Sequence, residues 1–405
     1  MSPTSLPRLI FINRYFDPDQ SATSRLLSDL VLALEHDIVV LTSRQRYDDP
    51  NALLPATEAR GRVTVRRLAG TRFGRGTLVG RSIDYLSFYG AMIFTLLKQA
   101  RAGDIVIPMT DPPMLSLLAV PIARRKGCRV VNWLQDLYPE VAQAVGTPLL
   151  TPMMARLIKG LRDRSLRAAD CNVVIADAMA ERLVTLEVKK ERIRVIHNWV
   201  DDQALRHIPT YENPLRRAWD LENRFVVGYS GNLGRAHDIE TILSAARELA
   251  DSQFIFLCIG GGARYEALKR AAQERGLTRL FRFMRYQSAT DLSYSLSLPD
   301  VHWISLKPEF EGLLFPSKLY GIAAVGRPII AITSKNSELA RLVSHYDCGA
   351  VIEQGDGYGL ALELKRLRDA PDACSAMGAR AQMMLNSRFT KAEAIRRWKE
   401  TLREV

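Results

Sequence analysis

Cysteine is scarce in this sequence, and the few cysteines present do not indicate a cross-linked or metal-bound fold. The 405 residues include five: Cys128, Cys171, Cys258, Cys348 and Cys374. Because their number is odd, their spacing is wide and no CxxC pair occurs, neither a disulfide framework nor a zinc site is indicated. We expect them to be reduced and mostly in the core.

Long apolar runs are also missing. No stretch reaches the roughly 18 uninterrupted apolar residues that a membrane-spanning helix requires. No basic segment precedes the first apolar run, "RLIFIN" at 8–13, so this run is predicted to be a strand and not part of a signal peptide. We therefore expect the protein to stay in the cytoplasm.

Acidic residues are in the minority. The chain has 56 Lys and Arg against 44 Asp and Glu, a net charge of +12. The excess is concentrated in residues 60–101, which hold nine Lys and Arg but only one acid, Asp84. Such a balance favours an anionic partner. Because no nucleic-acid-binding motif is present, we expect a phosphorylated ligand or an anionic membrane surface and no nucleic acid.

Short β-rich runs alternate with longer helical patterns along nearly the whole chain. This alternation is typical of parallel sheets covered by helices. The runs form two series, each sufficient for a six-stranded sheet, so the sequence predicts an α/β protein with two Rossmann-like domains. The first series is 8–13, 37–42, 63–68, 104–109, 129–134, 171–176 and 193–198; the second is 225–230, 253–260, 281–284, 301–306, 328–333 and 349–353.

A polar, proline-containing segment at 201–224 separates the two series and indicates a linker. We expect an N-terminal domain over 1–205, a C-terminal domain over 206–385, and a last helix over 386–405 that crosses back to the first domain. Open α/β sheets bind ligands at the carboxyl ends of their strands. The site is therefore expected in a cleft between the two facing domains.

Two glycine-containing turns follow strands of the second series. Gly231 and Gly234 in "SGNLGRAHD", and Gly260 and Gly261 in "IGGG", would let backbone N–H groups approach a phosphate. Neither turn matches the dinucleotide pattern GxGxxG or the P-loop GK[ST]. A tight connection from strand to helix explains either turn equally well.

The stretch "EGLLFPSKLYGIAAVGRP", residues 311–328, combines more signals. Ser317 is a plausible N-cap, and Gly326 followed by Pro328 marks the end of a helix of about two turns. Free N–H groups at its beginning, with Lys318 beside them, are suited to a diphosphate.

The order of these motifs resembles the donor half of glycosyltransferase family 4. Its members have the two-domain GT-B fold and transfer sugars from nucleotide diphosphates with retention of configuration, usually without a metal. The stretches "RYFDPDQSATSRLLSDLVLAL", "TDPP", "NWLQDLYPE" and "IHNWVD" resemble the branch that builds bacterial O-antigens, capsules and exopolysaccharides, including colanic-acid-type and N-acetylfucosamine transferases. The resemblance covers essentially the whole chain.

This resemblance implies a retaining, metal-independent glycosyltransferase with no cofactor beyond its substrate. The donor would be a nucleotide diphosphate sugar, with UDP as the expected nucleotide. The acceptor would be a polyprenyl-diphosphate-linked saccharide at the inner face of the cytoplasmic membrane.

The sequence departs from the family pattern in its donor half. The second of two glutamates in the pattern falls at Gly321 when counted from Gly326, or at Leu319 when counted from Glu311. This sequence therefore has no glutamate at the position where the family pattern has one to contact the ribose.

Two cations and one histidine of the pattern are also replaced. The common Arg and Lys after the first donor strand are Asn232 and His237, and the acceptor-domain His is Gln135. We expect Lys318 to replace the missing cations at the diphosphate, with Arg235 as second candidate.

The resemblance implies three catalytic residues. Lys318 would stabilise the diphosphate, Glu311 would orient the donor sugar, and Asp136 would position or deprotonate the acceptor. The expected donor-binding residues are Gly231, Asn232, Arg235, His237, Gly260, Gly261, Arg285, Tyr286, Ser317 and Gly321. The expected acceptor-binding residues are Asp17, Ser21, Ala22, Thr23 and Asp111.

Several of these residues also have a purely structural explanation. Glu311 could be an exposed loop acid, and Glu309 could take its role. Asp136 could cap a helix, Asp111 could belong to an ordinary turn, and His237 could simply begin a helix.

Two segments compete for contact with a membrane. Residues 83–98 are apolar with basic flanks, and residues 151–167 form a basic amphipathic pattern that includes Arg162. A helix that covers a sheet shows the same apolar stripe. Two other functions stay open: a GT-B sugar-nucleotide 2-epimerase, which needs no acceptor, and a non-catalytic sugar-nucleotide-binding subunit of unknown oligomeric state.

Overall fold

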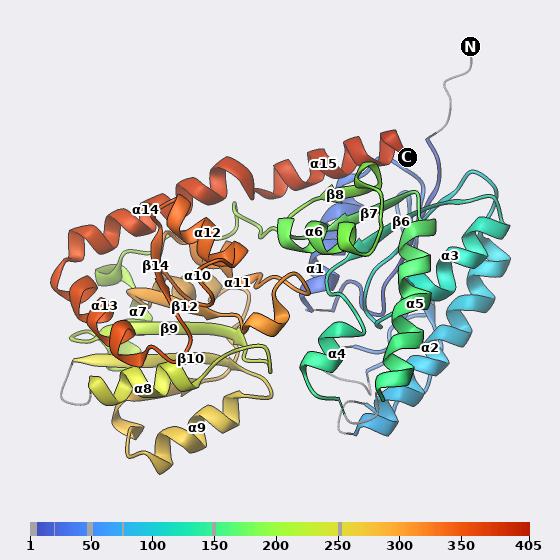
Figure 1. Ribbon diagram of the computed structural model, residues 1–405. Coiled ribbons are helices and arrows are strands. Elements are labelled where there is room, and N and C mark those ends of the chain that lie inside the picture. Colours follow the sequence, from blue (N-terminus) through green and yellow to red (C-terminus); the bar gives the residue numbers. More distant parts are fainter. Residues whose placement is uncertain (1–5, 20, 47–51, 75–76, 148–150, 250–252) are drawn as a thin grey trace. The chain divides into compact units, whose positions relative to one another are not determined.

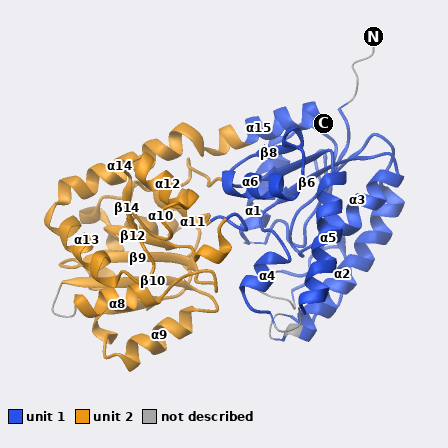
Figure 2. Cartoon of the chain, viewed as in Figure 1, with its two compact units in different colours: residues 1–197, 312–315, 395–405 blue, residues 198–311, 316–394 orange. Residues whose placement is uncertain are grey.

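The computed structural model describes residues 6–19, 21–46, 52–74, 77–147, 151–249 and 253–405 (Figure 1). The chain forms two compact units, which Figure 2 shows in different colours. Unit 1 comprises Met1–His197, Gly312–Phe315 and Ile395–Val405, and unit 2 comprises Asn198–Glu311 and Pro316–Ala394.

Unit 1 is built on an eight-stranded sheet with the order β3-β4-β2-β1-β5-β6-β7-β8. All seven predicted runs of the first series form parallel strands, whereas the edge strand β3 pairs antiparallel with β4. Its sequence "TEAR" has no apolar run, so hydrophobic pattern did not predict it. The strands are β1 (Leu9–Ile12), β2 (Ile38–Ser43), β3 (Thr57–Arg60), β4 (Val63–Leu68), β5 (Ile105–Pro108), β6 (Arg129–Leu134), β7 (Cys171–Val174) and β8 (Ile193–Val195).

Helices cover this sheet and bury its inner strands. Every residue of β1 is fully buried, and Ile10 belongs to a core cluster with Phe88, Met92 and Leu115 from two covering helices. The helices of unit 1 are α1 (Ala22–Ala33), α2 (Leu78–Gln99), α3 (Leu115–Arg125), α4 (Glu140–Ala144), α5 (Pro152–Ala168), α6 (Asp177–Thr185) and the 3-10 turn η1 (Lys190–Arg192).

Unit 2 is built on a six-stranded parallel sheet with the order β11-β10-β9-β12-β13-β14. All six predicted runs of the second series form these strands. The strands are β9 (Phe225–Asn232), β10 (Phe254–Gly261), β11 (Phe281–Met284), β12 (Val301–Ser305), β13 (Ile329–Ile332) and β14 (Gly349–Ile352).

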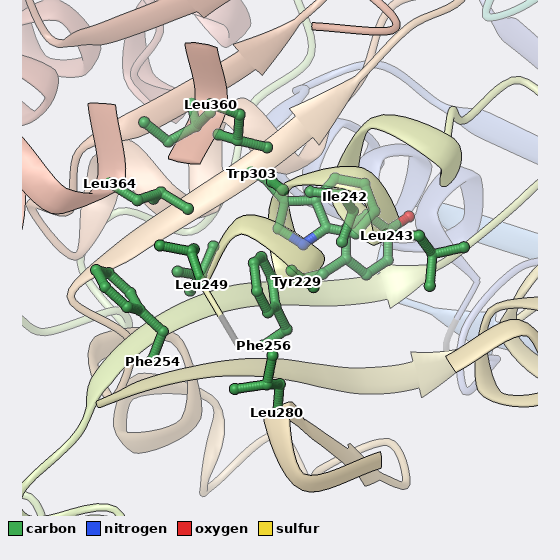
Figure 3. Close-up of a cluster of buried hydrophobic side chains, with 14 of the residues drawn as sticks. Tyr229, Ile242, Leu243, Leu249, Phe254, Phe256, Leu280, Trp303, Leu360 and Leu364 are labelled. Atoms are coloured by element: carbon green, nitrogen blue, oxygen red, sulfur yellow. The ribbon is translucent and has the colours of Figure 1, made fainter. Parts of the chain in front are cut away.

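Large side chains fill the core of unit 2. Figure 3 shows Tyr229 and Trp303 from the sheet beside Ile242 and Leu360 from two helices. The helices are α7 (Pro214–Ala218), α8 (Glu240–Glu248), α9 (Tyr265–Glu274), α10 (Leu292–Ser297), α11 (Lys318–Ala324), α12 (Glu338–His345), α13 (Gly357–Asp369) and α14 (Pro371–Arg388), with 3-10 turns η2 (Thr210–Glu212), η3 (Thr278–Leu280) and η4 (Pro308–Phe310).

The last helix, α15 (Lys391–Glu404), begins among residues of unit 2 and ends among residues of unit 1. Trp398 on this helix is fully buried, and its ring centroid lies 4.7 Å from that of Trp133 in β6. Leu313, from the short segment of unit 1 between two parts of unit 2, accepts a backbone hydrogen bond from Leu137.

The segment 201–224, which its polarity marked as a linker, is an ordered part of unit 2. It contains α7, and Arg216 in this helix is buried. The guanidinium donates to the Leu298 carbonyl and lies 2.7 Å from Asp300 Oδ1. The buried guanidinium of Arg216 thus has hydrogen-bond partners inside unit 2. A hydrophobic pattern cannot predict the burial of such a charged residue.

Candidate functional site

The two glycine turns lie side by side at the carboxyl ends of β9 and β10, with Gly231 opposite Gly260 in the parallel register. Both have positive φ, 122° and 130°. A Cβ at position 260 would lie 2.2 Å from the Gly231 carbonyl oxygen, so this position requires glycine for packing of the turns against each other. A Cβ at position 231 would lie 3.1 Å from Lys318 Cε.

Lys318 begins α11 and lies over the Gly231 turn. Its Nζ is 5.1 Å from the centroid of the Tyr229 ring and 3.5 Å from His237 Nε2. Burial lowers the pKa of Lys318 to about 8. Among the residues that the structure describes, no carboxylate lies within ion-pair distance of this ammonium. Lys318 is partly buried, and a charge held away from solvent without a counter-charge is typical of a site that receives its partner from outside the chain.

His237 is buried, and its ring contacts the Lys318 ammonium. Its Nδ1 lies 2.7 Å from the Ser305 carbonyl oxygen, which can only accept, so Nδ1 carries the proton. Burial and the neighbouring Lys318 lower the pKa of His237 to about 3. The imidazole is therefore neutral at physiological pH and supplies no positive charge to a phosphate.

The other donor-binding candidates near these turns have exposed side chains. They are Asn232, Arg235, Arg285 and Tyr286. The Tyr286 ring covers the second turn, because a Cβ at Gly261 would lie 3.3 Å from its Cε2.

Ser317 and Gly321 in α11 differ from what the sequence suggested. Ser317 occupies the N-cap position, but its backbone is helical, its side chain is exposed and it makes no capping hydrogen bond. At Gly321 a Cβ would meet only Leu296 Cδ1, at an ordinary 3.5 Å. The protein itself therefore has room for a Cβ there.

Glu311 contributes to the local structure of unit 2. Its Oε1 accepts a hydrogen bond of 2.8 Å from the backbone N–H of Glu338 at the start of α12. The carboxylate thus satisfies one of the unpaired donors of that helix. Glu309, the alternative acid, is exposed.

Two acids of unit 1 follow neighbouring parallel strands. Asp111 comes after β5 and Asp136 after β6, and these strands pair in register. Burial and the negative charge of Asp111 raise the pKa of Asp136 to about 6. A carboxyl group with this pKa is well suited to accept a proton from a hydroxyl group near neutral pH. It can also hold such a hydroxyl by accepting a hydrogen bond from it.

The remaining acceptor candidates lie around the start of α1 and already have partners within unit 1. Asp17 forms an ion pair with Arg60 at 2.5 Å. Ser21 caps the helix through Ser24, and Thr23 Oγ1 lies 3.5 Å from an Asn13 side-chain nitrogen. Ala22 is the first residue of the helix.

Sequence reasoning missed Arg14 and Tyr85. Arg14 is buried two residues after the end of β1, 5.0 Å from the centroid of the Tyr85 ring and 3.6 Å from Asp84 Oδ2. Burial and the negative charge of nearby Asp111 raise the pKa of Tyr85. The signal was present, because Arg14 ends a strand of the same sheet in the same way as Asp111.

Two protein-family models match this chain, one over most of each unit. Residues 20–199 match the model of the glycosyl transferase 4-like domain, and residues 213–384 match that of glycosyl transferases group 1. The chain belongs to glycosyltransferase family 4. The predicted family and the GT-B fold class are thereby confirmed.

Two relatives share much of the length of this transferase. WbjE of Pseudomonas aeruginosa, named for glycosyltransferase activity, is 26% identical over 88% of either chain. WcaI of Escherichia coli strain K12, whose name refers to a colanic acid biosynthesis glycosyl transferase, is 29% identical over 63% of either chain.

A solved structure shows the same fold. HepE of Anabaena, crystallised with UDP, aligns with a TM-score of 0.73 over 98% of this transferase and 100% of the HepE chain, at 14% identity. At that identity the match establishes the GT-B fold alone.

Proposed function

We propose that this transferase moves a sugar, with retention of configuration and without a metal, from a UDP-sugar to a lipid-linked saccharide during the synthesis of a bacterial surface polysaccharide. The observation that carries the proposal is the partly buried ammonium of Lys318, which lies beside the glycine turns without an acidic partner among the described residues. A nucleotide diphosphate would supply the missing negative charge. Crystals of HepE contain UDP and UDP-glucose, which supports a nucleotide sugar as donor.

In the proposed reaction, Lys318 acts on the leaving group. The acceptor hydroxyl oxygen bonds to the anomeric carbon while the bond from that carbon to the diphosphate breaks, and the hydroxyl proton passes to the departing phosphate oxygen. Negative charge therefore grows on the diphosphate, where a fixed ammonium stabilises it most strongly. Because the diphosphate favours the protonated lysine, donor binding raises the pKa of Lys318 above about 8.

Asp136 is proposed to position the acceptor hydroxyl. Its carboxylate, ionised above a pKa of about 6, accepts a hydrogen bond from the hydroxyl and turns the oxygen toward the donor. Asp111 follows the adjacent strand and is proposed to contact the acceptor. The loop before α1 and the start of that helix are also proposed to contact the acceptor, through polar groups that do not bond within unit 1. The residues proposed are Asp17, Ser21, Ala22 and Thr23.

Different donor-binding residues are proposed to contact different parts of the nucleotide sugar. Gly231, Asn232, Arg235, Gly260 and Gly261 lie at the turns proposed to face the diphosphate, and Arg285 with Tyr286 is proposed to flank the base. Ser317 and Gly321 are proposed to lie against the nucleotide. Glu311 is proposed to orient the sugar through the oxygen that does not bond to α12.

Peripheral binding to an anionic membrane surface is part of the proposal, since a lipid-linked acceptor resides there. Helices α2 and α5 both pack on α3 (Figure 1). Both helices expose apolar side chains. Every described helix is too short or too polar to span a bilayer. The exposed apolar residues on these helices are Val79, Ile83, Leu86, Phe94 and Leu97 on α2, and Met153, Met154, Leu157 and Leu161 on α5.

Charge on α5 agrees with this proposal, with one correction. Arg156 and Arg164 are exposed beside the apolar side chains and suit an anionic surface. Arg162, which the sequence grouped with them, is instead buried and pairs with Glu140 at 2.6 Å. It cannot reach a lipid headgroup, because a buried ion pair strongly disfavours separation.

A transfer assay tests the function. The purified protein is incubated with labelled UDP-sugars and polyprenyl-diphosphate-linked saccharides, and the anomeric configuration of the product is determined by NMR. Transfer with retention supports the proposal, and transfer with inversion would refute the mechanism. Conversion of a UDP-sugar in the absence of acceptor would show an epimerase, and donor binding without any conversion would show a binding subunit.

A further inference from the structure

His237 and Lys318 form a pair that the sequence did not predict. In the family pattern a lysine stands at the position of His237, after the first strand of the donor half. In this chain the ammonium comes from a different element, α11, and its Nζ reaches to 3.5 Å from the imidazole that stands in place of that lysine. The positive charge is therefore present but is delivered by another side chain.

The imidazole can accept a hydrogen bond from this ammonium. Its Nδ1–H is directed at the Ser305 carbonyl, 2.7 Å away, which leaves the lone pair on Nε2 toward Lys318. The carbonyl of Asn232, which accepts a hydrogen bond of 2.7 Å from the Tyr229 hydroxyl and has a second lone pair, also lies near the ring. Because the Ser305 contact takes the single N–H of the neutral ring at Nδ1, Nε2 is an acceptor.

Three neighbours define the place of the ammonium. The face of Tyr229 lies on one side, the bare Cα of Gly231 lets the stem approach closely, and His237 Nε2 accepts from Nζ. An ammonium has three donors. Within the described residues, Nε2 is the only hydrogen-bond acceptor recorded for Nζ, so donors remain for a ligand.

We propose that His237 is a positioning residue: its Nε2 holds the Lys318 ammonium in the orientation that meets the diphosphate of the donor. This inference rests on the proposed function. Both burial and the adjacent cation keep the ring neutral, which an acceptor for an ammonium must be. A charged imidazole would repel Lys318 instead of orienting it.

Two substitutions separate this role from a merely structural one. In His237→Gln, the side-chain oxygen reaches the place of Nε2 and keeps the acceptor for Lys318, but the bond to Ser305 is lost. In His237→Asn, the amide nitrogen takes the place of Nδ1 and keeps the bond to Ser305, but the acceptor for Lys318 is lost. A positioning role predicts that Gln retains most of the kcat and that Asn lowers it about ten- to a hundredfold, the effect of one hydrogen bond to a charged group.

The reverse order, with Asn active and Gln impaired, would overturn the inference and leave a structural role through Ser305. A double-mutant cycle with Lys318→Met gives a second criterion. If His237 acts through Lys318, then His237→Asn has little further effect once Lys318 is Met. Additive losses would contradict the inference.

A measurement on the unsubstituted protein avoids any failure of the variants to fold. Nitrogen chemical shifts of the His237 ring report which nitrogen carries the proton. A neutral ring protonated on Nδ1 supports the inference, and a ring protonated on Nε2 refutes it. Absence of sugar transfer by the unsubstituted enzyme would count against the proposed function, whereas transfer that is insensitive to His237→Asn would count against His237 alone.

Discussion

Replacement of Lys318 by Met is expected to reduce activity while making the free protein more stable. Met preserves the unbranched stem that lies over Gly231 and Tyr229 but removes the ammonium. Loss of one fixed group that stabilises charge in a transition state typically lowers the rate about a hundred- to a thousandfold. We expect a fall of that size in kcat/KM for transfer from the UDP-sugar.

The gain in stability follows from the pKa of Lys318. Burial lowers this pKa from 10.5 to about 8, so the charged form is disfavoured in the folded protein by at most about 3 kcal/mol. Because the folded pKa lies below the unfolded one, this cost is fully present below about pH 8 and disappears as the pH rises toward 10.5. Lys318→Met should therefore raise the melting temperature at pH 7 by up to roughly 10 °C for a unit of this size.

Calorimetry at pH 7 and at pH 10, with and without UDP, tests this reasoning. The stability gain should shrink at the higher pH, and UDP should raise the melting temperature of the unsubstituted protein more than that of the variant. Lys335→Met is a suitable control, because Lys335 is an exposed lysine of the same unit. A variant that keeps full activity, or one that loses activity together with stability, would refute the assignment of Lys318.

Four further predictions concern other residues. Gly260→Ala should destabilise unit 2 by about 3 kcal/mol or more in denaturant unfolding, because its Cβ would lie 2.2 Å from a carbonyl oxygen; Gly321→Ala should leave folding intact yet weaken UDP binding measured by calorimetry. In the unsubstituted enzyme, kcat should rise with pH through about pH 6 as Asp136 loses its proton. In Asp136→Asn this rise should be absent. Leu157→Asp should lower sedimentation with anionic vesicles about tenfold, whereas Leu32→Asp, at an equally exposed leucine of α1, should not.

Hydrophobic pattern predicted the strands well, because parallel strands buried on both faces are nearly continuous apolar runs. It missed β3, which is held by backbone pairing with β4 and has no apolar signature. It also placed Arg162 among exposed basic residues, since periodicity cannot reveal that Glu140 lies opposite.

The candidate site could be predicted in part. Lys318 stood out because it lies beside a short helix start, but its contact with His237 joins residues far apart in the sequence, and only the fold brings them together. The hydrogen bond between Glu311 and α12 is of the same kind. Such pairings depend on side-chain directions at the ends of strands, which no spacing rule specifies.

The way the chain threads through unit 1 limits how this enzyme can be recombined with its relatives. Gly312–Phe315 and Ile395–Val405 belong to unit 1 although unit 2 segments precede both. A single crossover near residue 198 would therefore bring residues of the other parent into unit 1, including the counterpart of Trp398, which packs against Trp133. Chimeras that exchange unit 2 should need four junctions, with both short segments kept from the parent that supplies unit 1.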